Sequence, residues 1–167
     1  MGKSTSELLI KAMIMYESGV PFRVHHFLKV YGFAKTIGEL ENINNYTLHV
    51  LETAAIVHDI GIKPALEKYE SSEGKYQEEL GVAPAVEILS ELGYKKETIE
   101  RVCFLVAHHH TYTDVEGIDW QILLEADFLV NILEGKMSSE SIKEIYTNIF
   151  KTKHGRELCR MMYMIED

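Results

Sequence analysis

Apolar residues recur at helical intervals along almost the whole of this 167-residue chain. This spacing places them along one face of an α-helix, whereas a half-buried strand would show strict alternation. No segment alternates convincingly over the length of a strand. The sequence therefore predicts an all-α fold, a compact bundle of about seven or eight helices.

Glycine, proline and capping residues divide this pattern into segments. Pro21 fits the first turn of a helix that should run to about Glu39. Gly61 fits the end of a helix that begins near Asn44 or Asn45. The polar stretch over 61–76 predicts a loop or a short broken helix. We expect further helices over about 77–92, 97–109 and 119–134, with two more after residue 138.

We expect a single domain over residues 1–167, with a core over about 20–135 and supporting C-terminal helices over 136–167. A chain of this length can bury roughly 70% of its unfolded surface, which suffices for a core without disulfides. Its two cysteines do not make a disulfide framework, and no signal-peptide pattern or long apolar run is present. These features predict a cytoplasmic protein without membrane association.

The balance of charged residues limits the possible partners. The chain has 17 Lys and Arg against 26 Asp and Glu, so its formal net charge is −9. An acidic surface repels the phosphate backbone of nucleic acids, and a nucleic-acid polymer is therefore not expected as a partner. If the protein handles a small phosphorylated molecule, a local source of positive charge is needed, and this points toward a bound cation.

Several histidines and aspartates lie in or beside apolar stretches, where side chains are expected to point inward. They are His26, the His58-Asp59 pair, Asp127 and the run His108-His109-His110. A buried, unpaired carboxylate is costly, so it usually pairs, shifts its pKa or binds a metal. Each residue alone has a structural explanation; Asp127, for example, can pair with Arg101. Together they predict a mixed imidazole and carboxylate site, which suits Fe, Mn, Ni, Co or Zn.

The residues around these positions carry a family resemblance. Arg23-Val24-His25-His26, followed by Val30 and Ala34, resembles the first motif of the HD superfamily of metal-dependent phosphohydrolases. The segment Ala55-Ile56-Val57-His58-Asp59-Ile60-Gly61 is similar to the second motif, and Ala126-Asp127 to the last. The resemblance covers about residues 20–135 and implies an all-helical bundle, in agreement with the periodicity.

The resemblance also implies a ligand set. Carried over residue by residue, it makes His26, His58, Asp59 and Asp127 the ligands of a divalent metal. His26 has the family's spacing to the apolar residues that follow, and His25 is the alternative register.

A second ion is an open question in the sequence. Some similar HD proteins hold two metals and add a His-His pair, which here looks like His108-His109. They also add a histidine that this chain lacks, and Glu78 or Glu79 is a candidate to replace it. We therefore expect one or two divalent transition-metal ions.

The resemblance implies hydrolysis of a small phosphate ester, such as a nucleotide or a related phosphomonoester, by metal-activated water. In that mechanism Asp59 orients the water as well as binding metal. Arg23 and Lys63 are the nearest candidates to contact the phosphate, and an arginine suits bidentate binding better. His110 and Tyr112 are further candidates to contact the substrate.

Two alternatives come from other functional classes. One is a di-iron oxygenase of the same superfamily, and the other is a non-catalytic ligand-binding module that contains a metal. A homodimer is also possible, because Met161, Met162 and Met164 can pack either in the core or at a dimer contact. Core packing is the favoured expectation for these methionines.

Overall fold

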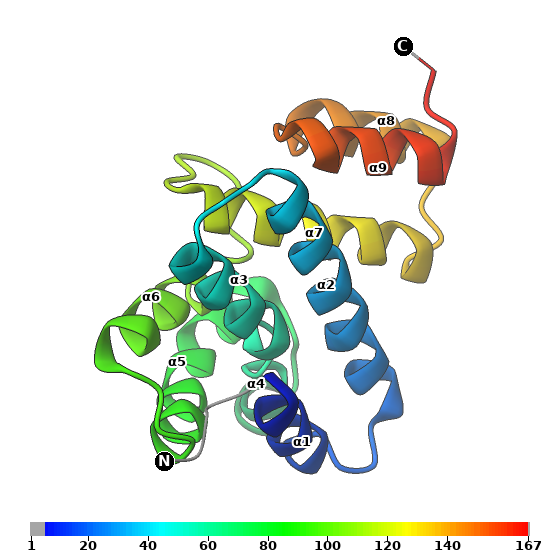
Figure 1. Cartoon of the computed structure of the whole chain (residues 1–167). Helices are drawn as coiled ribbons and strands as arrows, with labels where there is room; N and C mark the ends of the chain where they lie inside the picture. Colours follow the sequence, from blue (N-terminus) through cyan, green and yellow to red (C-terminus); the bar gives the residue numbers. More distant parts are fainter. Residues whose placement is uncertain (1–5, 167) are drawn as a thin grey trace.

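The computed structural model describes residues 6–166, and this part of the chain contains nine α-helices and no strand (Figure 1). The all-α prediction is confirmed. The helices are α1 (Ser6–Tyr16), α2 (Pro21–Leu40), α3 (Asn45–Val57), α4 (Ile62–Tyr69), α5 (Gly74–Glu91), α6 (Lys96–Val106), α7 (Ile118–Glu134), α8 (Ser139–Asn148) and α9 (Lys153–Tyr163). None of the described helices is long and apolar enough to cross a membrane.

Helix α4 lies in the segment for which the sequence predicted a loop or a short broken helix. Of its eight residues only Ala65 is buried, so the apolar stripe that marks a helix in sequence is missing. Glu70 ends the helix in a left-handed conformation, with φ of 51°. Tyr69 then stacks on Tyr76 at 4.2 Å between ring centroids, which fastens α4 to α5.

Helix α2 packs against both α3 and α7 (Figure 1). The small residues Ala34 and Ala54 are fully buried and let these helices approach closely. Helix α7 is buried along most of its length, mainly through leucine, isoleucine and alanine. Asp127 is therefore held inside a rigid apolar helix that faces α2.

A tight turn follows α3 and carries His58 and Asp59. Gly61 closes this turn, and a Cβ at that position would overlap the backbone carbonyl oxygen of Gln77. Gly81, one turn further along α5, lies against Gly61 and Val106. These glycines let α5 pack directly on the turn, and the packing brings Gln77 to the site.

The C-terminal helices are attached to the bundle by two carboxylates, one buried and one partly buried. Glu125 of α7 is fully buried and accepts hydrogen bonds from the backbone N–H groups of Lys151 and Thr152, at 2.7 and 2.9 Å. Glu41, at the end of α2, accepts one from the N–H of His154 at 2.7 Å. These amides lie at or just before the start of α9, where the helix itself cannot satisfy them.

The methionines in α9 and directly after it are not in the core. Met161 is 60% exposed, and Met164 is 84% exposed. Core packing was the favoured expectation, and it is wrong because the only residues that α9 buries are Gly155 and Cys159. The alternative of a dimer contact stays a prediction.

Replacing Glu125 by alanine should lower the free energy of unfolding by about 2–4 kcal/mol, because the N–H groups of Lys151 and Thr152 lose their acceptor. Urea denaturation followed by circular dichroism measures the change. The matched control is Glu144→Ala on exposed α8, which should change stability by no more than about 0.5 kcal/mol. Equal effects of the two substitutions would contradict the role given to Glu125.

Candidate metal centre

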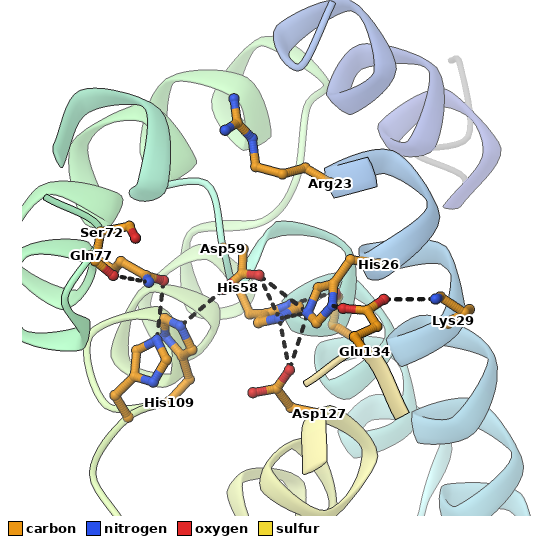
Figure 2. Close-up of polar contacts among 12 residues, drawn as sticks. Arg23, His26, Lys29, His58, Asp59, Ser72, Gln77, His109, Asp127 and Glu134 are labelled. Carbon is orange, nitrogen blue, oxygen red and sulfur yellow. Dashed lines mark hydrogen bonds and ion pairs between the residues drawn. The ribbon is translucent and has the colours of Figure 1, made fainter. Parts of the chain in front are cut away.

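Four side chains from three parts of the fold meet at one point (Figure 2). His26 comes from α2, His58 and Asp59 from the turn after α3, and Asp127 from α7. The Nε2 atom of His26 lies 3.3 Å from His58 Nε2, 3.2 Å from Asp59 Oδ2 and 3.2 Å from Asp127 Oδ1. The sequence analysis predicted that these four residues lie together, and in the structure they do. His25, the alternative register, is exposed and points elsewhere.

Backbone and carboxylate acceptors set the orientation of the imidazole rings. His58 Nδ1 donates to the carbonyl of Ala55 at 2.8 Å, and His109 Nδ1 donates to the carbonyl of Val106 at 2.7 Å. A carbonyl oxygen only accepts, so in each neutral ring the proton is on Nδ1 and Nε2 carries a lone pair. His109 Nε2 is buried without a hydrogen bond among the described residues, 3.3 Å from Asp59 Oδ1. The inward-facing atoms are thus acceptors directed at one another.

The pKa values show how strongly this arrangement attracts positive charge. Burial by itself lowers the pKa of His58, but Asp59 and Asp127 outweigh burial and hold that pKa well above its ordinary value. Burial raises the pKa of Asp59, yet His58 and His109 hold it well below the usual range. Asp59 and Asp127 therefore stay ionised, and His26 and His58 take up protons more readily than a free imidazole does. A divalent ion can replace those protons, since metal binding requires neutral imidazole and ionised carboxylate.

The described residues contain two groups with donor atoms close enough to share an ion. The first is His26, His58 and Asp59, and the second is Asp59, His109 and His110. Within each group the donor atoms lie within 4.8 Å of one another. The donors are imidazole nitrogens and carboxylate oxygens, which fit a divalent transition metal. Asp59 belongs to both groups and directs one oxygen at each.

The structure corrects the expected histidine pair. His108 does not face the cluster: its Nδ1 donates to the carbonyl of Phe104 at 2.7 Å, and its ring stacks on Phe104 at 4.1 Å. The edge of Trp120 covers it further. His109 and His110 are the two that face Asp59, because α6 ends at Val106 and the chain then turns.

Neither Glu78 nor Glu79, the candidates to replace the missing histidine, points into the cluster. Glu78 accepts from the backbone N–H of His110 at 2.9 Å and from the Thr111 hydroxyl at 3.1 Å, so it anchors that turn. Glu79 is exposed and binds Lys68 and Tyr69. The side chain that enters the site is Gln77, which the sequence analysis did not select (Figure 2).

Of the two cationic candidates, only Arg23 lies at the site. Its Nε donates to buried Glu17 at 2.6 Å, and it lines the pocket above the cluster. Lys63 was expected to contact phosphate, but its Nζ donates to the carbonyl of Tyr16 at 3.2 Å and lies over that ring. This correction follows from the direction of α4, which turns Lys63 toward α1.

Tyr112 lies beside the site without lining its pocket. Its ring packs on Phe128 at 5.3 Å between centroids, and its hydroxyl is 3.4 Å from His110 Nδ1. Burial raises the pKa of Tyr112 to about 12, so the phenol keeps its proton at neutral pH. Burial lowers the pKa of His110 to about 4. In the structure Tyr112 is thus a neighbour of His110.

Sequence analysis missed a supporting carboxylate on α7. Glu134 Oε2 lies 2.8 Å from His26 Nδ1, and its other oxygen pairs with Lys29 at 2.6 Å (Figure 2). A carboxylate in this position holds the ring and leaves Nε2 directed at the cluster. Asp127, Asn131 and Glu134 follow one another at helical spacing on a mainly apolar helix, and this polar stripe was a usable signal.

The cluster opens into a pocket of about 200 Å³. Its lining combines acidic, imidazole and amide groups with one cation and two apolar side chains. The lining residues are Phe22, Arg23, His26, Asp59, Ile62, Gln77, His110, Asp127, Asn131 and Glu134.

Comparisons with known proteins agree with this architecture. A family model described as the HD domain matches residues 23–150. The fold is similar to the crystal structure of a predicted HD superfamily hydrolase from an uncultured Thermotogales bacterium, with a TM-score of 0.68 and 19% identity. That alignment covers 95% of this chain and 84% of the other. A search of curated proteins found no match.

Replacing Asp59 by alanine should abolish tight metal binding, because both oxygens that face the imidazoles are removed. Elemental analysis of the desalted protein measures metal per chain, and far-ultraviolet circular dichroism should show that most helical content remains. His25→Ala, a substitution of the exposed neighbouring histidine, should keep full occupancy. Full metal occupancy in the Asp59 variant would refute its assignment as a ligand.

Proposed function

The chain belongs to the HD domain family, and we propose that it is a metal-dependent hydrolase of small phosphate esters. The observation that carries the proposal is the buried meeting of His26, His58, Asp59 and Asp127 beneath a small polar pocket. Buried carboxylates and imidazoles directed at one another favour bound positive charge, and the pocket gives a substrate access to an ion held there.

The four residues His26, His58, Asp59 and Asp127 would hold the ion. When bound, a divalent metal supplies Lewis acidity toward a phosphoryl oxygen and lowers the pKa of water. The side chain of Asp59 is 21% exposed, whereas that of Asp127 is 7% exposed. Asp59 is therefore the carboxylate that can reach solvent in the pocket, where it accepts a hydrogen bond from water and orients it. Glu134 keeps His26 in place during this process.

Arg23 supplies the positive charge that a phosphate needs in an acidic protein. Its anchor to Glu17 fixes the guanidinium at the pocket, next to the 64% exposed ring of Phe22. A guanidinium suits the planar, two-point binding of phosphate oxygens. Lys63 has no place in this proposal, because it is directed at Tyr16.

The size and charge of the site support a small substrate. A pocket of about 200 Å³ accommodates a phosphoryl group and part of a small molecule. The net charge of −9 disfavours a nucleic-acid polymer. A nucleotide or another small phosphomonoester is the substrate class that fits both the size of the pocket and the net charge.

The purified protein, loaded with Mn²⁺, Co²⁺, Ni²⁺ or Zn²⁺, should release inorganic phosphate from phosphomonoesters. Asp127→Asn should reduce the rate by roughly 100-fold or more, because the ion loses a ligand held by α7. Phosphate release over a panel of nucleotides and sugar phosphates measures both. A folded, metal-loaded protein that turns over no phosphomonoester, phosphodiester or pyrophosphate would instead support the non-catalytic module.

Replacing Arg23 by alanine should raise KM for a phosphomonoester by about tenfold or more, since a charge-assisted hydrogen bond to the substrate is lost. Metal content should not change. Lys63→Ala is the matched control, and its KM should equal that of the unmodified protein. Equal KM values for all three proteins would remove Arg23 from the binding site.

A di-iron oxygenase is the second candidate function, and the group of Asp59, His109 and His110 is the observation that favours it. This function needs two irons per chain. Two equivalents of iron together with O₂ consumption would establish it, whereas phosphate release from phosphomonoesters would support the hydrolase.

A further inference from the structure

We propose that Gln77 keeps the second metal position closed, so that this centre holds a single ion. The inference rests on the proposed metal site, because the ion is assigned to His26, His58, Asp59 and Asp127. It concerns the second group of donors, in which His109 and His110 face Asp59.

The orientation of the Gln77 amide is defined by its surroundings. Gln77 Nε2 donates to the backbone carbonyl of Ser72 at 2.7 Å, which requires the nitrogen of the amide on that side (Figure 2). Gln77 Oε1 is then the atom 3.1 Å from His110 Nε2. Because the amide oxygen only accepts, His110 Nε2 donates to it and carries the proton. This nitrogen has no lone pair for an ion.

The other nitrogen of His110 also has a partner. His110 Nδ1 lies 3.4 Å from the hydroxyl of Tyr112, which is placed to donate to its lone pair. Freeing either nitrogen for a metal therefore breaks a hydrogen bond. Gln77 is buried, so water does not readily replace the hydrogen bond between its Oε1 and His110 Nε2.

Packing prevents the His110 ring from turning away from Gln77. A Cβ on Gly74 would lie 2.7 Å from His110 Cγ, which shows that the backbone of α5 presses on the imidazole. The ring of His110 also contacts that of His109, at 4.0 Å between centroids with the planes tilted by 46°. The backbone N–H of His110 donates to Glu78 at 2.9 Å, so the main chain is fixed too.

With His110 engaged, the second position retains two available donors, Asp59 Oδ1 and His109 Nε2. Protein sites for catalytic zinc commonly use three protein ligands, so two donors make a weak site. The first position has His26, His58 and Asp59 around it, with Asp127 within 3.5 Å of both imidazoles, and His26 is further held by Glu134. One tightly bound ion is the result, and chemistry that needs two irons is disfavoured.

The test is the number of ions per chain, counted by elemental analysis after loading with excess Mn²⁺ and desalting. The unmodified protein should retain one ion. Gln77→His should retain two, because an acceptor for the His110 proton is replaced by an additional imidazole ligand. His108→Ala, outside the cluster, should leave the count at one.

The location of the added ion is tested with the double variant Gln77→His/His109→Ala, which should return to one ion. Electron paramagnetic resonance should show spin-coupled manganese in Gln77→His and uncoupled manganese in the unmodified protein. Gln77→Ala is a second variant with a smaller side chain, and its affinity for a second Mn²⁺ should rise by roughly tenfold or more.

Two ions in the unmodified protein would overturn the inference and leave the proposed hydrolase intact. One ion in Gln77→His, with helical content and melting temperature preserved, would overturn it as well, as would an unchanged second affinity in Gln77→Ala. No ion in any variant would remove the proposed function and the inference together. Activity is not needed for any of these outcomes.

Discussion

The centre of this molecule is organised by buried imidazoles and carboxylates that face one another and need positive charge between them. Asp59 and Asp127 are ionised, and His58 and His109 have their protons on the side of backbone carbonyls. Such a meeting of lone pairs is unfavourable inside an apolar bundle unless positive charge neutralises it. The arrangement persists because hydrogen bonds to the outer nitrogen of each imidazole and the packing of the helices fix these side chains in place.

That support comes from helices α2, α3, α5 and α7 and from the turn after α3. The packing of α2 on α3 and α7 brings His26, His58 and Asp127 together, and the backbone of α3 orients the His58 ring. The Gly61 turn lets α5 approach closely enough for Gln77 to reach His110. A few small residues therefore decide which polar groups meet, although they carry no chemistry themselves.

The periodic helices and the His-Asp residues were accessible to sequence reasoning because burial leaves a pattern. Helix α7 shows this best, since its long apolar run exposes Asp127 as an exception. Helix α4 left almost no pattern, because Ala65 is its only buried residue. The three consecutive histidines carry no periodicity at all, so the sequence could not tell that His108 stacks on Phe104 while His109 and His110 face Asp59.

By itself, the sequence determined the all-α class and the residues around which a metal site can form. The spacing of apolar residues is a local property of a helix, and a polar residue inside such a pattern is visible without coordinates. Only the tertiary structure decided the direction of Lys63, the support of His26 by Glu134 and the contact between Gln77 and His110. These depend on how helices distant in sequence pack against each other, and local periodicity does not encode that geometry.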